Sequence, residues 1–205
     1  MRKLLIIGLI IFSSISTYSQ INTKIISFET RYPIPIGNNF INKGFDKGYS
    51  GQIDFGIDYN VINKRKLGIG VLLNASFLNL SETDVNLLIL SPKVKVEYEI
   101  DLNRISILPQ FGIGYSKWLF RGSEMTYFDE ISDQFQKRKY KEDQSGLTIM
   151  GSTKFLINSN KRIKWFLKLS YEFTKLEKDD IGNSKFNRNI HLFYPGVGMT
   201  WNFRE

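Results

Sequence analysis

Charged side chains recur at every second residue in several parts of the chain, and this spacing is the first indication of possible chemistry. In the clearest run, Lys93, Lys95, Glu97 and Glu99 alternate with apolar residues. Carboxylates beside ammonium groups can act as an acid/base pair or line an ion path. Enclosed charges, however, must neutralise one another, because an unpaired buried charge is strongly destabilising. We expect this structural role, as a charge network inside the fold, for Asp54, Asp58, Lys93, Lys95, Glu97, Glu99, Lys164, Lys168 and Glu172.

The connector 121–145 is the longest stretch without a clear alternation, and long connectors in compact proteins often carry function. Its first half is acidic and its second half is basic, with aromatic residues between. Two interpretations stay open. The basic residues contact lipopolysaccharide phosphates or an acidic protein partner, or the charges of the connector pair with one another in solvent. The interaction candidates are Lys137, Arg138, Lys139 and Lys141.

No cofactor pattern is found in the sequence. There is no cysteine, which excludes disulfides and thiolate metal sites. The glycine pairs, such as Gly68 and Gly70, stand at strand spacing and relieve crowding, with no following helix to cradle a phosphate. We therefore expect no cofactor, no metal site and no catalytic residue.

Eight segments alternate large apolar residues with polar or small ones, a period of two that indicates β-strands. They span 26–32, 53–61, 67–77, 90–100, 105–115, 147–157, 163–173 and 197–203, and no segment indicates a helix. Pro92 and Pro109 lie within two of these segments. Because proline lacks a backbone donor, we expect a bulge or irregular pairing at each.

The connectors alternate in length. Those at 63–66, 101–104 and 158–162 are tight turns, whereas those at 37–48, 81–86, 121–145 and 176–189 are mostly longer. Short turns at one end and longer loops at the other are typical of transmembrane β-barrels, whose turns are periplasmic. The connector 121–145 can also extend its flanking strands as a hairpin above the membrane.

The orientation of the strands decides between two kinds of barrel. If the apolar face of each strand contacts lipid, the charges are enclosed in a barrel too narrow for a wide pore. The alternative is a secreted soluble barrel that holds an apolar ligand. Aromatic residues favour lipid, because they gather near both strand ends, where interfacial girdles are expected. These residues are Tyr59, Tyr98, Phe155, Trp165, Trp201 and Phe203 at the turn side, and Tyr32, Phe77, Tyr115, Tyr171 and Phe173 at the loop side.

The amino terminus has the layout of a secretory signal peptide. Arg2 and Lys3 precede an apolar run that is too short to span a bilayer, and small residues follow. We predict a signal peptide at 1–19, cleaved between Ser19 and Gln20, and an outer-membrane β-barrel domain at 20–205. The chain has 28 basic and 20 acidic residues, and removal of Arg2 and Lys3 leaves 26 against 20, a net charge of +6. This excess is interleaved with acidic residues and does not indicate nucleic-acid binding.

The carboxyl-terminal sequence GMTWNF, with Gly198, Trp201 and Phe203, resembles the signal by which outer-membrane barrels are recognised by their insertion machinery. It departs from that pattern because Arg204 and Glu205 follow the last aromatic residue. Together with the strand pattern, it makes the chain resemble small porin-like outer-membrane β-barrels, including eight-stranded adhesin-type and structural barrels. The resemblance covers nearly all of 20–205 and implies residence in the outer membrane among lipid and lipopolysaccharide.

Some eight-stranded barrels are lipid A deacylases that use a histidine and a serine two positions further on. The single histidine of this chain is His191, and the corresponding position holds Phe193, so the nucleophile is missing. We expect a non-enzymatic barrel with a structural or surface-interaction role through its outer loops. The alternatives are a narrow pore or subunit of an envelope transport complex, a lipid-modifying enzyme, and the soluble barrel described above.

Overall fold

The structure is a computed structural model that describes residues 24–37, 39–43, 48–64, 66–80, 84–129, 134–157, 162–177 and 188–203. The signal peptide predicted at 1–19 lies outside these residues and stays a prediction.

Strands make up nearly all of the described chain. In order, the elements are β1 Lys24–Arg31, β2 Ile34–Ile36, α2 Phe40–Lys43, β3 Tyr49–Lys64, β4 Leu67–Leu80, β5 Asn86–Tyr98, β6 Ile100–Leu102, β7 Ile105–Asp129, β8 Gln134–Ile157, β9 Ile163–Leu176 and β10 Asn189–Phe203. Within the described ranges, no helix has the length and apolar character needed to cross a membrane.

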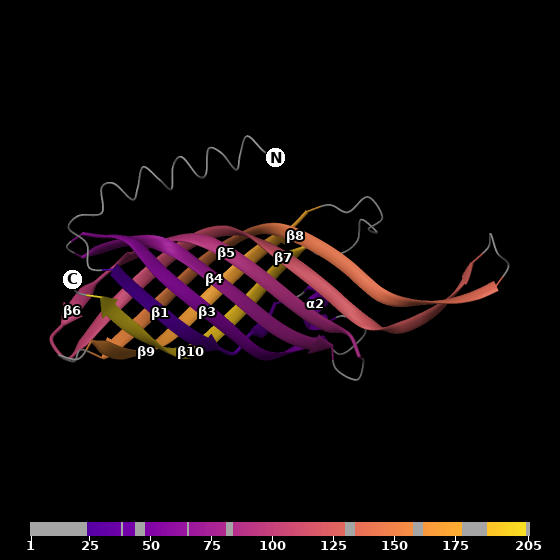
Figure 1. The fold of residues 1–205 in the computed structure, drawn as a ribbon, viewed down its shortest axis with the longest axis horizontal. Helices are drawn as coiled ribbons and strands as arrows, with labels where there is room; N and C mark the ends of the chain where they lie inside the picture. Colours follow the sequence, from indigo (N-terminus) through magenta and orange to yellow (C-terminus); the bar gives the residue numbers. More distant parts are fainter. Residues whose placement is uncertain are drawn as a thin grey trace.

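Eight of these strands form a closed antiparallel barrel. Each long strand pairs with the next one along the chain, and β1 closes the ring by pairing with both β3 and β10. The strands tilt strongly against the long axis of the barrel (Figure 1). The two remaining strands are short: β2 pairs with β10 beyond the end of β1, and β6 continues the line of β5 against β7. The predicted all-β, up-and-down, eight-stranded barrel is confirmed.

Burial alternates residue by residue along the strands. In β5, Val94 is 58% exposed while the next residue, Lys95, is 2% exposed. In β9, Leu167 is exposed and Lys168 is fully buried. The apolar face of the barrel therefore points outward and the charged face is enclosed. This is the reverse of a soluble barrel, and it suits a surface covered by hydrocarbon.

Aromatic side chains lie on the outer wall near both ends of the barrel, as expected for interfacial girdles. Tyr98, Trp165 and Trp201 are exposed at the end that carries the short turns, which we call the turn-side end. Tyr32 and Tyr171 are exposed toward the opposite, loop-side end.

The two prolines interrupt pairing without a bulge. Pairing between β5 and β7 stops after Leu90↔Lys117 and resumes at Lys93↔Gly114 in the same register, so the ladder is missing at Pro92. It stops again at Glu97↔Gln110, next to Pro109, and β6 resumes the same register at Ile100↔Ile107. The expected irregular pairing is present, but the register shifts lie elsewhere, within the β3–β4 and β7–β8 pairs.

The connector 121–145 is largely strand. β7 and β8 remain paired beyond the barrel as far as Asp129↔Gln134, and they project from its loop-side end (Figure 1). We call residues 121–145 the projecting hairpin. A register shift between Arg121 and Glu124 marks its base. Such an irregularity bends a strand pair and increases its twist.

An apolar core fills the loop-side end of the barrel. Inward residues from several strands pack around Ile41 of α2, which is fully buried. Asn39 caps this short helix, because its Oδ1 accepts hydrogen bonds from the backbone N–H groups of Ile41 and Asn42 at 3.1 and 3.2 Å. The core consists of Ile41, Leu78, Leu87, Ile89, Trp118, Phe120, Leu176, Ile190, Leu192 and Tyr194.

Candidate functional site

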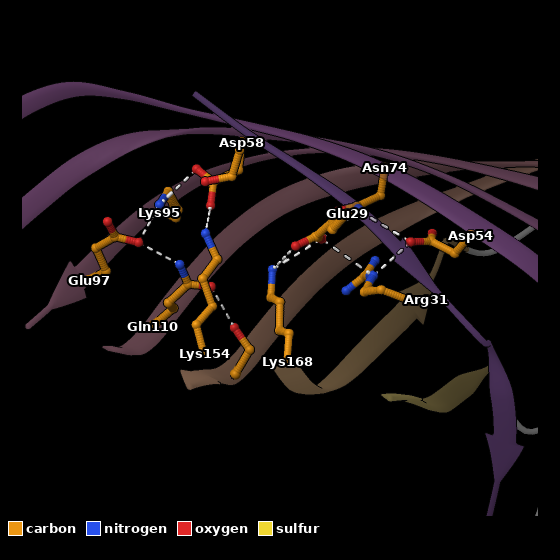
Figure 2. Close-up of polar contacts among 12 residues, drawn as sticks. Glu29, Arg31, Asp54, Asp58, Asn74, Lys95, Glu97, Gln110, Lys154 and Lys168 are labelled. Atoms are coloured by element: carbon orange, nitrogen blue, oxygen red, sulfur yellow. Dashed lines mark hydrogen bonds and ion pairs between the residues drawn. The ribbon is translucent and has the colours of Figure 1, made fainter. Parts of the chain in front are cut away.

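The middle of the lumen holds a buried charge network that divides into two clusters (Figure 2). The strand period of two positions it, because every charged member occupies an inward position between outward apolar or small residues. Cations and carboxylates come from β1, β3, β5, β8 and β9, so the network ties together strands from around the whole ring.

The first cluster is organised by Arg31 of β1. Its Nε donates to Asp54 Oδ1 at 2.6 Å, and its Nη1 donates to Glu172 Oε1 at 3.1 Å. Lys93 binds the other oxygen of Glu172 at 3.0 Å. Lys168 Nζ lies 2.7 Å from Glu29 Oε2. Each carboxylate of this cluster therefore faces at least one cation.

The second cluster is organised by Asp58 of β3. Its Oδ1 lies 2.7 Å from Lys95 Nζ, and its Oδ2 accepts a hydrogen bond from Lys154 Nζ at 2.5 Å. Lys95 also contacts Glu97 Oε2 at 2.5 Å. Gln110 Nε2 donates to the same Glu97 oxygen at 2.5 Å. Both oxygens of Asp58 thus have a cation of their own.

The charges of the lumen balance. The buried charged residues of the described chain are five cations and five carboxylates, so the enclosed formal charge is zero. The desolvation cost of burying ions is offset only when each has a partner and further hydrogen bonds. The ten residues are Arg31, Lys93, Lys95, Lys154 and Lys168, with Glu29, Asp54, Asp58, Glu97 and Glu172. This arrangement crosslinks strands and leaves no carboxylate free for acid/base chemistry.

Hydroxyl groups and an aromatic ring fill further space in the lumen. A row of hydroxyls crosses from β5 to β9, linking Ser91, Ser116, Thr148 and Thr174 at 2.5 to 2.8 Å. The Tyr194 ring lies under the Arg31 guanidinium, and the guanidinium Cζ is 4.2 Å from the ring centroid. The charge network therefore meets the loop-side core without a wide gap.

Seven of the nine predicted network residues lie in these clusters. The other two, Glu99 and Lys164, lie at the turn-side end, where both are half-buried and line a cavity of about 180 Å³. The sequence analysis missed Glu29, Arg31 and Lys154. All three alternate with outward residues in the same way as the predicted members, so strand parity alone was sufficient to find them.

Ion pairs hold the base of the projecting hairpin. Arg121 Nη1 lies 2.6 Å from Asp143 Oδ1, and Lys117 Nζ lies 3.6 Å from Asp143 Oδ2. The hydrogen bond from Arg121 lowers the pKa of the Asp143 carboxyl below its ordinary value. The predicted interaction candidates lie further along β8, where Lys137, Lys139 and Lys141 are exposed. The side chain of Arg138 lies outside the described residues.

His191 lies on the wall of the barrel near its loop-side end. Its Nδ1 is 2.5 Å from the Tyr171 hydroxyl, and its ring centroid is 5.1 Å from that of Phe173. These neighbours hold the imidazole between aromatic rings, and no serine, threonine or cysteine is among them. In the described ranges, no group of three or more histidine, aspartate or glutamate residues is arranged to hold a metal ion.

The residues of the predicted assembly signal lie in the closing strand. Gly198 is buried, and a Cβ atom there would clash with the Phe166 ring and the Phe28 carbonyl. Trp201 is exposed on the outer wall, and Phe203 pairs with Lys24. Close packing thus gives Gly198 a structural role, whatever its part in barrel insertion.

Comparisons with known proteins give the fold. No protein-family model and no curated protein matches the sequence. Among solved structures, neisserial surface protein A matches with a TM-score of 0.56 and 10% identity, over 88% of this chain and 97% of that one. A major outer membrane protein from Thermus thermophilus matches with a TM-score of 0.56 and 11% identity, over 89% of this chain and 100% of the other. At these identities the likeness concerns the fold alone.

The closed ring, the apolar outer wall and the enclosed charges define a transmembrane β-barrel. The fold it shares with these structures is that of small eight-stranded outer-membrane barrels. The outer membrane is accordingly the location of the protein, and the soluble-barrel alternative is excluded by the exposed apolar wall.

Proposed function

We propose that the protein is a non-conducting, non-enzymatic outer-membrane barrel that displays the projecting hairpin outside the cell for contact with an anionic surface. The observation that carries this proposal is the continued pairing of β7 and β8 beyond the barrel, from Glu124↔Lys139 to Asp129↔Gln134. A paired hairpin of this length presents its side chains in fixed rows, whereas an irregular loop does not.

Charge on β8 supports an anionic partner. Lys137, Lys139 and Lys141 occupy every second residue of the strand and are exposed. Side chains two residues apart on one strand face share a direction and stand roughly 6.8 Å apart. These lysines face the same side of β8 as Leu147, which is exposed on the apolar outer wall. The row therefore continues that wall toward the hairpin tip. A row of ammonium groups beyond the apolar outer wall is complementary in charge to the phosphate groups of lipopolysaccharide.

Filling of the lumen supports the absence of conductance. The charge network blocks the middle of the barrel, and the core around Ile41 blocks its loop-side end. A solute that crossed the barrel would have to break buried ion pairs and enter an apolar layer. Both steps are costly.

Lipopolysaccharide binding by charge-reversal variants tests the hairpin. The variant Lys137→Glu/Lys139→Glu/Lys141→Glu, refolded in detergent, is titrated with lipopolysaccharide and compared with the unmodified barrel. We expect affinity to fall at least tenfold and to lose part of its salt dependence, since each lost cation removes phosphate attraction. The matched control is Lys64→Glu/Arg104→Glu/Arg162→Glu, which reverses three exposed charges at the turn-side end. Equal affinity of the two variants for lipopolysaccharide would contradict the proposed contact.

Planar-bilayer recording tests the closed lumen. We expect the pure protein to give no stable conductance steps. Stable single-channel steps would contradict a sealed barrel and favour the pore alternative.

A mass spectrum of lipid A after incubation with the protein is expected to be unchanged, and a modified lipid would identify an enzyme.

The carboxyl-terminal residues support a further part of the proposal, recognition by the barrel insertion machinery. Trp201→Ala/Phe203→Ala is expected to slow insertion in cells while the purified protein still refolds in detergent. Equal impairment of insertion in cells and of refolding in detergent would instead assign these residues a role in stability.

A further inference from the structure

The cavity at the turn-side end of the lumen borders the charge network, because Glu97 and Lys154 of the second cluster are among its lining residues. Residues of all eight barrel strands surround its space of about 180 Å³. It is lined by Ile25, Ser27, Asn63, Lys66, Gly68, Glu97, Glu99, Leu108, Lys154, Leu156, Lys164, Thr200 and Asn202. A space of this size has room for a ligand of about ten non-hydrogen atoms.

Cations predominate around the mouth of this cavity. The lining holds three lysines and two carboxylates, Glu97 and Glu99. Lys154 is paired in the second cluster, which leaves Lys66 and Lys164. Among the described residues neither lysine takes part in an ion pair, in contrast to the five cations deeper in the lumen. The mouth therefore has one positive charge that no lining carboxylate balances.

The neighbouring turns add to this positive charge. Lys64, Arg104 and Arg162 are exposed there, while Asp101 is the acidic residue of the same described turns. Asp101 Oδ1 accepts a hydrogen bond from the backbone N–H of Asn103. An excess of positive charge around a cleft raises the local concentration of anions.

The wall of the cavity offers hydroxyl and amide groups. Ser27 and Thr200 stand side by side with their hydroxyl oxygens 2.9 Å apart. Asn202 also lines the cavity, and its side-chain oxygen is buried with no hydrogen-bond partner among the described residues. A buried amide oxygen without a donor is costly, and a ligand hydroxyl group that donates a hydrogen bond to it removes that cost.

We infer that this cavity is a binding site for a small hydroxylated anion of the periplasm, one that carries a phosphate or carboxylate group and at least one hydroxyl. Lys66 and Lys164 bind the anionic group at the mouth. Thr200 and Asn202 bind hydroxyl groups further in. The site is independent of the projecting hairpin, because the two lie at opposite ends of the barrel.

Glycerol 3-phosphate is a suitable probe, because it combines both kinds of group and has a matching size. The folded barrel is labelled with ¹⁵N, held in detergent micelles and titrated with the probe, while the amide signals of Ser27, Thr200 and Asn202 are followed by NMR. We expect saturable shifts with glycerol 3-phosphate, shifts at several-fold higher concentration with inorganic phosphate, and none with glycerol. Absence of saturable shifts with the phosphate ester would overturn the site.

Variants separate this site from general attraction to a basic surface. Lys66→Gln/Lys164→Gln is expected to weaken binding at least tenfold, whereas Lys64→Gln, an exposed change on the same turn, changes it less than twofold. A gel comparison of boiled and unboiled samples establishes that each variant is folded. Asn202→Asp provides a second test, since a carboxylate at the wall repels the anion without touching the mouth. Equal binding by all three variants would overturn the assignment.

A phospholipid headgroup carries the same chemistry as the free ester. Nanodiscs of phosphatidylglycerol and of phosphatidylcholine therefore form two further arms, without added ester. Shifts of the same three amides in phosphatidylglycerol alone would assign the source to the membrane. Shifts with the free ester in micelles assign it to a solute. Absence of shifts in every arm rejects both sources.

Discussion

Lys168 of β9 and Glu29 of β1 form an ion pair across the lumen, although another strand separates β9 from β1 in the ring. Lys168 Nζ lies 2.7 Å from Glu29 Oε2, and both side chains are fully buried. The residues are 139 positions apart in the sequence. The pair therefore acts as a crosslink between the first and the later strands of the barrel.

Removal of one partner is expected to leave the other as a buried charge with too few counterions. Lys168→Met should lower the free energy of unfolding by about 3 to 5 kcal/mol, and Glu29→Gln/Lys168→Met should recover part of this loss. Urea unfolding in detergent micelles measures both. The control Lys175→Met, at an exposed position of the same strand, should stay within about 0.5 kcal/mol. A double variant less stable than the single variant would contradict this role.

Asp143 at the base of the projecting hairpin is expected to titrate below the ordinary aspartate value. Its pKa is lowered chiefly by the hydrogen bond from Arg121. Because the folded-state pKa lies below the unfolded one, the contact stabilises the base fully above the unfolded pKa. That stabilisation is lost as the pH falls through the folded-state value. An NMR titration of the carboxyl carbon checks this, and Arg121→Gln should return the pKa toward the ordinary value. An unchanged pKa in that variant would contradict the assignment.

The alternation of inward and outward residues predicts the barrel because the two faces of each strand have different surroundings. Hydrocarbon selects apolar residues such as Val94, and the narrow lumen selects paired charges such as Lys95, so a one-residue slip would be costly at every position. The same parity places Lys154 inward, which makes the charge network largely predictable.

Two features could not be predicted from parity. The lumen near the loop-side end is apolar, with Leu78 and Trp118 on inward positions, because there a small core replaces the charge network. Ile41 joins that core from α2, a helix of one turn in a connector without periodicity. Its position depends on a core that it shares with residues far away in the sequence, such as Leu192, and no local pattern encodes that core.

Gly198 is expected to resist any side chain. A Cβ atom there would overlap the Phe166 ring and the backbone carbonyl of Phe28, so Gly198→Ala should cost about 1 to 3 kcal/mol in unfolding free energy. The matched control is Gly151→Ala, since nothing lies within 4 Å of a Cβ at Gly151. Unfolding of both variants in the same detergent gives the comparison. Equal stabilities would show that the closing strand tolerates a side chain at Gly198.

The depth of a residue in the bilayer should decide the cost of a charge on the outer wall. Val94 and Leu102 are nearly equally exposed, at 58% and 57%, but Val94 lies in the middle of β5 and Leu102 lies in β6 at the turn-side end. In lipid vesicles, Val94→Arg should cost about 2 to 4 kcal/mol and Leu102→Arg about 0 to 1 kcal/mol, because the penalty falls from the midplane to the interface. In water, equal exposure would instead predict equal and small costs. Equal costs in vesicles would therefore mean that the apolar wall does not face hydrocarbon, and the membrane orientation of the barrel would be wrong.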